Sequence, residues 1–518
     1  MKKSLFILGA SFLAFSCGST QEKQTTAKPA TPANPTEYAN TITSAELKDM
    51  LYTFASDEFE GRLTGQKGQK MAVEYLKQQY TDMEVPAAQA NGNYFQNVPL
   101  QIMEVPKVTL SINNQSFKMV DDFVSAATSK DGSVTSSQIM YAGYGIQDGT
   151  YNSYNNLNVK GKVVLIKAGE PKNADGTYVI SGTSEASKWS NFRQEFAAKR
   201  DIAKELGAAA VLFYAPDIYS MASQRFGRSS GRMALQGDAE TMYYLFVNTE
   251  LAENIMPNIN TATETEQLDV AFNMEYVNAS NTFTSENVVA FIEGSEKPEE
   301  VIVLTAHLDH EGVQDGEVYN GADDDGSGTV AILEIAEAFK TAVKNGHAPK
   351  RSIVFLHVTA EEKGLLGSRY YTDMDPIFPL KNTVANLNMD MIGRTDPKRT
   401  EGKDNYIYLI GSDKLSTELH EISEEMNKTY MNIELDYRFN ADNDPNRFYY
   451  RSDHYNFAKH NIPVIFYFNG THDDYHRPTD TPDKIRYDLL ENRSRLVFYT
   501  AWELANRAER IIVDKTFK

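Results

Sequence analysis

The chain has 518 residues, of which 41% are hydrophobic, 24% are charged and 11% are aromatic. This globular balance excludes disorder, collagen and coiled coil as descriptions of the whole chain, and the length suggests about three domains. The 51 lysine and arginine residues against 71 aspartate and glutamate residues give a net charge of −20. This charge argues against nucleic acid as the main partner, because phosphate binding needs a basic surface.

The first 40 residues are expected to lie outside the fold. We interpret residues 1–16 as a signal peptide, because a basic start precedes an apolar run that is too short to span a membrane. The run ends just before Cys17, the only cysteine, and this arrangement resembles a bacterial lipoprotein signal in which the cysteine carries the lipid. Residues 17–40, rich in Thr, Pro, Ala and Gln, are expected to form a flexible tether. We therefore expect an exported protein with a lipid anchor to the membrane, on the periplasmic, outer-membrane or cell-surface side. Ordinary secretion with an incidental cysteine is the alternative.

Two segments of different character follow the tether. Residues 41–119 are expected to form an N-terminal helical part of the main domain, since two amphipathic helical patterns flank a polar loop at 56–65. Residues 120–273 contain neither histidine nor cysteine, and their clearest patterns are strands at 161–167 and 207–214 and a helix at 195–206. We predict that residues 120–273 form an inserted β-rich domain that supplies no catalytic residue.

Residues 274–518 alternate between strand and helix patterns. The expected strands are 301–305, 352–358, 384–389 and 463–468, and the expected helices are 328–342, 365–371 and 489–507. This alternation predicts an α/β fold with a doubly wound, mostly parallel sheet. In such sheets, ligands bind just outside the C-terminal ends of the strands.

Residue types that bind metal ions follow the ends of these strands. The clusters are His307-Leu308-Asp309, Asp323-Asp324-Asp325, Glu361-Glu362, Asp390 and Tyr475-His476. Divalent cations bind imidazoles and carboxylates, and grouped carboxylates need cations to offset their repulsion. A single cysteine excludes a zinc site built from several thiolates. Several clusters alone have a structural explanation, such as helix capping by the three aspartates. Asp390 is harder to explain in this way, because a charge inside an apolar strand pattern needs a partner. The joint order of the clusters at one sheet edge favours a metal site.

The other histidines and one further motif are given structural interpretations. Five histidines are interpreted as ordinary residues without a role in the site: His310, His347, His357, His420 and His460. The roles of His454 and His472 are left undecided. Ser452-Asp453-His454 contains the residue types of a catalytic triad, but adjacent residues cannot readily form that relay. We interpret this tripeptide as part of the site wall.

In type, order and approximate spacing, the five clusters resemble the motifs of the di-zinc aminopeptidase and glutamate-carboxypeptidase family. The resemblance covers residues 282 to about 510, and the loop at 56–65 resembles the N-terminal part of longer members. Residues 120–273 resemble, more weakly, the protease-associated domain that is inserted in many members. The resemblance implies a zinc-exopeptidase fold, peptide substrates and two Zn²⁺ ions per chain, with Co²⁺ or Mn²⁺ as substitutes.

The resemblance also implies a set of five metal ligands. His307 and Asp390 would hold one ion, Glu362 and His476 would hold the other, and Asp324 would bridge the two. Two metal ions about 3.5–4 Å apart lower the pKa of a shared water and polarise the scissile carbonyl. A cis peptide bond after Asp324 is a further implied feature.

Three more residues have roles that the resemblance implies. Glu361 would act as the general base and later as the general acid, because it lies near the water without being a ligand. Asp309 would orient His307, as carboxylates beside metal-bound imidazoles usually do. Tyr475 would help to stabilise the tetrahedral oxyanion.

The expected function is a metal-dependent exopeptidase, with an aminopeptidase that acts on peptides outside the cytoplasm as the first hypothesis. The alternatives are a carboxypeptidase, a glutaminyl-cyclase-like acyltransferase and a non-catalytic receptor. Two complete metal sites argue against the cyclase, whose relatives use one zinc, and against receptors, which have lost ligands. Candidate determinants of substrate preference are Arg394, Tyr449, Tyr450 and Arg451. The sequence leaves the preferred substrate residue and the oligomeric state open.

Overall fold

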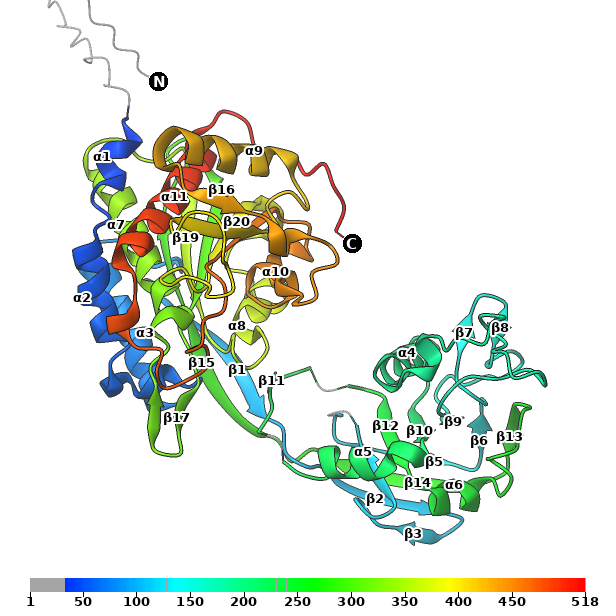
Figure 1. Ribbon diagram of the computed structural model, residues 1–518. Helices are drawn as coiled ribbons and strands as arrows, with labels where there is room; N and C mark the ends of the chain where they lie inside the picture. The colour runs from blue at the N-terminus through cyan, green and yellow to red at the C-terminus, as the bar shows by residue number, and fades with distance from the viewer. Residues whose placement is uncertain (1–32, 127–128, 230, 239, 518) are drawn as a thin grey trace, which may run out of the picture.

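The computed structural model describes residues 33–126, 129–229, 231–238 and 240–517. Figure 1 shows a larger unit, which contains both ends of the described chain, and a smaller inserted unit beside it. The predicted signal peptide and Cys17 lie outside the described residues. Within the described ranges, no helix is both long enough and apolar enough to cross a membrane.

A nine-stranded sheet forms the centre of the larger unit. Its strands, in spatial order, are β11 (Met233–Leu235), β1 (Phe95–Ile102), β15 (Asn281–Ile292), β19 (Arg351–Val358), β16 (Lys297–His307), β20 (Thr383–Met389), β23 (Val464–Phe468), β21 (Tyr406–Ile410) and β22 (Glu434–Asp436). The four central strands, from β19 to β23, are parallel to one another. Antiparallel pairs join both flanks to this parallel centre, at β15 and at β21. The expected α/β sheet is therefore present, and its parallel part is the part that carries the predicted ligands.

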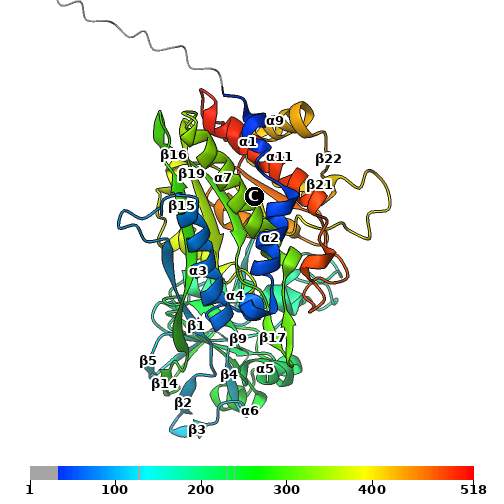
Figure 2. The same cartoon turned by 90° about the vertical axis from the view of Figure 1, so that its left-hand side faces the viewer.

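Helices cover both faces of this sheet. One face packs against α1 (Pro35–Ala39), α2 (Ser44–Phe54), α3 (Lys67–Asp82), α7 (Gly328–Lys344), α9 (Thr417–Met426) and α11 (Tyr487–Asn506). The other face packs against α8 (Leu366–Arg369) and α10 (His454–Ala458). Figure 2 shows α1, α2, α3, α7 and α11 in front of the sheet, with the inserted unit below it. The helix α7 is buried along most of its length, because it packs against the sheet and against α1, α2 and α11.

The predicted range of the tether, residues 17–40, extends too far at its C-terminal end, because its last residues are folded. Residues 35–39 form α1, which begins with Pro35 and is capped by the side chain of Asn34. Tyr38 is buried and its ring stacks on Trp502 of α11, with centroids 5.5 Å apart. The segment has a polar composition, but the single aromatic side chain of Tyr38 packs against the main domain and holds one turn of helix there.

The inserted unit has two larger sheets, one two-stranded hairpin and two hydrophobic clusters of its own. The six-stranded sheet runs in the order β13 (Glu266–Leu268), β6 (Ile139–Tyr141), β9 (Val163–Lys167), β10 (Ala210–Tyr214), β12 (Tyr243–Val247) and β4 (Phe123–Ser125). The four-stranded sheet runs in the order β3 (Gln115–Phe117), β2 (Lys107–Ile112), β14 (Phe272–Val277) and β5 (Gly132–Ser136). The helices of this unit are α4 (Phe192–Glu205), α5 (Tyr219–Phe226) and α6 (Thr249–Ile255). Two hairpins complete the described strands: β7 (Gln147–Asp148) with β8 (Tyr151–Asn152), and β17 (Gly312–Gln314) with β18 (Glu317–Tyr319), the second of which belongs to the larger unit.

The limits of the inserted unit differ from the predicted 120–273. The strands β2 and β14 pair antiparallel along their whole length, so the unit extends from 107 to 277. In addition, β11 lies within the inserted segment but pairs with β1 at the edge of the large sheet. Both features depend on pairings between residues more than 100 positions apart, which local sequence patterns do not reveal.

Candidate metal centre

The predicted metal ligands lie at the C-terminal ends of adjacent parallel strands. His307 is the last residue of β16, and Asp390 directly follows β20. The loops after β19 and β23 carry Glu362 and His476. Because β16 lies between β19 and β20, with β23 next to β20, these side chains meet at one edge of the sheet. The remaining ligand, Asp324, comes from the irregular turn Ala322–Ser327 that leads into α7.

Asp324 lies between two groups of ligand atoms. Its Oδ1 is 3.0 Å from His307 Nε2, which is 3.8 Å from Asp390 Oδ1. Its Oδ2 is 3.0 Å from His476 Nε2, which is 3.1 Å from Glu362 Oε2. Ligand atoms with zinc bonds of about 2.0–2.2 Å lie roughly 3–4 Å from one another. The structure thus contains a first half-site (His307, Asp390 and Asp324) and a second half-site (Glu362, His476 and Asp324).

The chemistry of these half-sites fits a divalent cation. Asp324 is only 3% exposed, and its Oδ2 has no hydrogen-bond partner within the described chain. The buried Oε1 of Glu362 likewise lacks a hydrogen bond there. Leaving buried carboxylate oxygens without partners is costly, and a bound cation removes that cost. Imidazole and carboxylate donors together are the ligands that zinc takes when thiolates are absent.

The charges of the pocket lead to the same conclusion. Burial opposes a charged imidazole at His476, but the nearby carboxylates of Asp324 and Glu362 raise its pKa to about 10. Burial also opposes charge on His307, yet Glu361 and the other carboxylates raise its pKa well above the ordinary value. The carboxylates around His307 and His476 therefore favour a positive charge at this position. A metal ion would supply that charge.

Glu361 lies beside the first half-site without belonging to either half-site. Its Oε2 is 3.9 Å from His307 Nε2, and its side chain is 10% exposed. Its backbone N–H donates to Asp309 Oδ1 at 3.1 Å, which fixes the start of the loop. Burial raises the pKa of the Glu361 carboxyl well above its ordinary value. A carboxyl group in this position is able to accept and return a proton.

Comparison with known proteins shows which family the part of the chain that carries this centre resembles. Residues 287–501 match the family described as peptidase family M28. These residues are similar to an M28 peptidase domain, and we call them the M28 domain. All the ligands and Glu361 lie within them.

Relatives of the M28 domain differ in the activity that their names state. Aminopeptidase YwaD of Bacillus subtilis (strain 168) is 33% identical over 26% of this chain and 30% of its own length. The probable leucine aminopeptidase 2 of Aspergillus oryzae is 28% identical over 67% of this chain and 58% of its own length. The probable glutamate carboxypeptidase LAMP1 of Arabidopsis thaliana is 33% identical over 23% of this chain and 16% of its own length. The chain thus spans less than two thirds of the length of each of these relatives. Similarity to this family, and to a relative named as a probable zinc metalloprotease, implies zinc as the metal.

Asp309 makes different contacts from those that the resemblance implied. The group that accepts a hydrogen bond from His307 Nδ1, at 2.9 Å, is the backbone carbonyl of Asp309 and not its carboxylate. This bond places the Nε2 lone pair of His307 toward Asp324. The carboxylate of Asp309 instead accepts from the Glu361 N–H and, at 2.7 Å, from the Thr64 hydroxyl. Asp309 is two residues beyond the end of β16, so its carbonyl reaches back to His307 while its side chain reaches the next loop.

Tyr475 lines the pocket above the ligands. Its ring stacks on His476, with centroids 3.9 Å apart, and its Oη lies 3.5 Å from Arg451 Nη2. Burial, together with nearby Asp324, raises the pKa of Tyr475, so the phenol keeps its proton. The M28 domain thus places a hydrogen-bond donor at the pocket mouth.

The pocket at the ligands is acidic at its base and apolar on one wall. Its lining consists of Asp324, Glu361, Asp390, Met391, Phe448, Arg451, Phe466, Phe468, Thr471 and Tyr475. Of the four residues predicted to set substrate preference, only Arg451 lines it. Arg394 instead pairs with Asp474, with Nη2 and Oδ2 3.0 Å apart.

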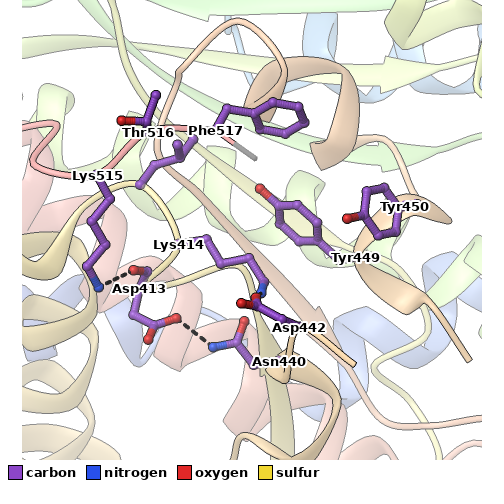
Figure 3. A pocket seen from close by; sticks show the side chains of 10 residues that line it. Asp413, Lys414, Asn440, Asp442, Tyr449, Tyr450, Lys515, Thr516 and Phe517 are labelled. Atoms are coloured by element: carbon purple, nitrogen blue, oxygen red, sulfur yellow. Dashed lines mark hydrogen bonds and ion pairs between the residues drawn. The ribbon is translucent and has the colours of Figure 1, made fainter. Parts of the chain in front are cut away.

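Tyr449 and Tyr450 line a separate hollow of about 330 Å³. Figure 3 shows these two rings near Lys414 and Asp442, with residues 515–517 forming another wall. This hollow is larger than the pocket at the ligands, but it contains none of the predicted ligands. We therefore place the chemistry in the smaller pocket, where the donor atoms converge.

The sequence patterns indicated no role in the centre for His310 or Arg62. His310, which was interpreted as ordinary, is buried, and its Nδ1 lies 2.8 Å from Glu362 Oε1. Ser452, which belongs to the tripeptide interpreted as site wall, is fully buried behind the ligands and donates to Asp390 Oδ2 at 2.6 Å. Arg62 is fully buried and donates to the carbonyls of Leu308, Phe54, Asn320 and Gly321. One sequence feature could have indicated that His310 belongs to the centre. It lies three residues after His307, just beyond the end of a strand.

The peptide bond between Asp324 and Asp325 is cis, as the resemblance implied. The carboxylate of Asp325 accepts from the backbone N–H groups of His307, Gly328 and Met391. Asp325 is therefore committed to backbone contacts, although it lies close to His307 and Asp390.

Proposed function

We propose that the chain is a zinc-dependent exopeptidase that removes N-terminal residues from peptides. The observation that carries this proposal is the pair of half-sites that share Asp324, with Glu361 beside them as a free carboxyl group. Two of the relatives described above are named as aminopeptidases, which supports the same reaction class.

In this proposal the two half-sites hold one zinc ion each. Bound zinc polarises the scissile carbonyl and lowers the pKa of a water molecule. His307 is kept in the tautomer whose Nε2 faces the half-site, because its Nδ1 is bonded to the Asp309 carbonyl. Glu361 accepts the proton of the attacking water and returns it to the leaving amine. The Tyr475 phenol donates a hydrogen bond to the developing oxyanion.

The names of two relatives favour an aminopeptidase over a carboxypeptidase. Glu361 lines the base of the pocket and is not a ligand, so its carboxylate is free to accept a hydrogen bond from the amine of a free N-terminus. The apolar wall of Met391, Phe448 and Phe466 suits an apolar first side chain. A carboxypeptidase remains the second candidate, because exposed Arg451 at the pocket mouth is placed to attract a substrate carboxylate.

Hydrolysis of leucyl-p-nitroanilide by the zinc-loaded protein tests the proposal, with its N-acetylated form as the comparison. We expect turnover of the free amine only. Turnover of N-acetyl-peptides from their C-terminal end would establish the carboxypeptidase instead, and cyclisation of N-terminal glutamine would establish the acyltransferase.

Two glutamate variants test the assigned base. Glu361→Gln keeps the size of the side chain but cannot accept a proton, so we expect bound zinc to be retained and turnover to fall by at least about 100-fold. Glu317→Gln, at an exposed hairpin position, is the matched control and is expected to keep full activity. Wild-type turnover by Glu361→Gln would move the base to another residue.

We further propose that the enzyme works outside the cytoplasm, anchored by a lipid on Cys17. The support comes from the sequence alone, in which the only cysteine directly follows the apolar run. Cys17→Ser should release the protein from the membrane fraction, as measured by fractionation and immunoblotting. An unchanged distribution would contradict the anchor.

A further inference from the structure

His310 lies beside the second half-site, and its ring nitrogens have no hydrogen bonds within the described chain. Its side chain is fully buried. A buried imidazole without any partner is costly. The two carboxylate oxygens nearest to its Nδ1 are Glu362 Oε1 at 2.8 Å and Asp324 Oδ2 at 3.8 Å, and these oxygens also lack hydrogen bonds. Three buried polar atoms that make no hydrogen bond to the described residues therefore lie close together, in a group able to hold a metal ion.

The spacing of these atoms suits coordination to a common ion. Four ligands around one zinc, at bonds of about 2.0–2.1 Å, lie roughly 3.3 Å apart. The separations from His310 Nδ1, 2.8 and 3.8 Å, lie on either side of that value, and those from His476 Nε2, 3.0 and 3.1 Å, lie just below it. The rings of His310 and His476 approach edge to face, with centroids 5.7 Å apart. Two imidazoles thus approach the same carboxylates from different directions.

The chain is built to hold the ring in this place. Gly321 has a φ of +55°, and a Cβ there would lie 2.5 Å from Cγ of His310, so only glycine leaves room for the imidazole. The backbone N–H of His310 donates to the Arg62 carbonyl at 3.3 Å. Arg62 in turn donates to the carbonyls of Leu308 and Gly321, on both sides of the ring. The position of His310 is therefore fixed before any ion binds.

We propose that His310 is an additional protein ligand of the second zinc, bound through Nδ1. This inference rests on the proposed metal centre. It gives the second half-site four protein ligands, His310, His476, Glu362 and Asp324, and leaves the first with His307, Asp390 and Asp324. Closed sites with four protein ligands are typical of structural zinc, whereas sites with three keep a position open for water or substrate. The two ions are therefore unequal: the second is held tightly, and the first, beside Glu361, has the open position.

Zinc titration of the metal-free full chain against a chromophoric chelator tests the assignment without any measurement of activity. We expect two separate steps in the wild type. In His310→Asn the tighter step should weaken by more than about 100-fold, because even the loss of an outer hydrogen-bond partner costs about 10–100-fold. Asn retains an N–H that is able to donate to Glu362. If His310 acted only as a hydrogen-bond donor, the His310→Asn variant would therefore keep the zinc affinity of the wild type. His357→Asn is the matched control, since His357 is equally buried but is bonded to Tyr80.

A second measurement on the wild-type protein does not depend on the folding of a variant. Zinc-edge X-ray absorption counts imidazoles, and we expect three imidazoles over two ions, from His307, His310 and His476, in place of two. Unchanged titration steps in His310→Asn, or two imidazoles over two ions, would overturn the assignment. Failure of wild-type protein to bind zinc at all would instead overturn the proposed function.

Discussion

At the level of single residues, Asp324 has the most demanding position in the centre, because each of its two oxygens faces a different imidazole. Its neighbour Asp325 has the same side chain but accepts backbone N–H groups instead. The two residues are adjacent and chemically identical, so their roles differ only through the direction in which the turn points them.

Removal of the shared carboxylate should therefore affect both ions. We expect Asp324→Ala to lose nearly all bound zinc, whereas Asp390→Ala, which removes a ligand of the first half-site only, should retain one ion. Metal analysis after dialysis measures the difference. Equal zinc content in the two variants would show that Asp324 does not belong to both half-sites.

The hydrogen bond from Ser452 should tune the first half-site alone. Its hydroxyl donates to Asp390 Oδ2 at 2.6 Å and accepts from Asn388 Nδ2 at 2.8 Å, which orients the other Asp390 oxygen toward His307. We expect Ser452→Ala to weaken zinc binding there by about 10–100-fold and to leave the second site unchanged. Ser494→Ala, which removes a buried hydroxyl in α11, is the control in the same zinc titration. A loss of affinity at both sites would contradict this local role.

Sequence patterns predicted which side chains meet at one edge of the sheet, but not all of their contacts. The order of motifs at strand ends indicated that His307, Asp324 and Glu361 lie close together, as they do. It assigned the carboxylate of Asp309 to a contact that its carbonyl makes, and it gave His310 no role. Both outcomes depend on the path of the loop after β16, which residue type does not specify.

At the level of elements, α7 carries a buried acid that the chemistry of the pocket does not use. Glu334 is 2% exposed and accepts a hydrogen bond from the backbone N–H of Thr43, the N-cap of α2, at 3.1 Å. Burial raises its pKa from 4.5 to about 8. This side chain joins the first helices of the chain to the main domain.

Glu334 should make stability depend on pH. Between pH 4.5 and about 8 the folded state keeps a proton that the unfolded state has released, so stability falls as the pH rises through that range. Glu334→Gln keeps the acceptor for Thr43 and has no charge to bury. We expect equal melting temperatures near pH 5 and a variant more stable by several degrees at pH 9.

Thermal unfolding at several pH values measures this effect. Glu425→Gln, at an exposed position on α9, is the control and should follow the wild-type curve. Parallel curves for wild type and Glu334→Gln would show that the acid is not buried in its charged form.

The elements themselves were largely predictable, and the exceptions share one cause. Local periodicity located α7, β19 and β20 to within a residue or two, since each buries a continuous apolar pattern. It missed α1, whose burial depends on the distant ring of Trp502, and the pairing of β2 with β14. In each of these cases the stabilising partner is more than 100 residues away.

At the level of the whole molecule, the inserted unit is joined to the M28 domain by more than its two chain connections. Residues Met233 and Leu235 of β11 pack in one cluster with Val98, Ala360 and Leu366. Asp238 also forms a two-oxygen ion pair with Arg369, at 2.8 and 2.9 Å. The inserted unit therefore contacts the loop that carries Glu361, although it supplies no candidate ligand within the described residues.

Excision of residues 120–273 should consequently damage the M28 domain. The deletion removes β11, exposes the backbone of β1 and uncovers the apolar cluster around Ala360. We expect most of the truncated protein to be insoluble, as measured by its soluble fraction and by size-exclusion chromatography. A soluble monomer with the zinc content of the full chain would show that the inserted unit is dispensable.

The pairing of β11 with β1 also restricts how the two units move. Two connections, near 103–106 and 278–280, would by themselves form a hinge about which the inserted unit swings freely. A third attachment away from the hinge, formed by backbone hydrogen bonds and the Asp238–Arg369 pair, fixes the angle between the units. Any swing large enough to change access to the zinc pocket must first detach β11, so slow, rare opening is expected here in place of continuous fluctuation.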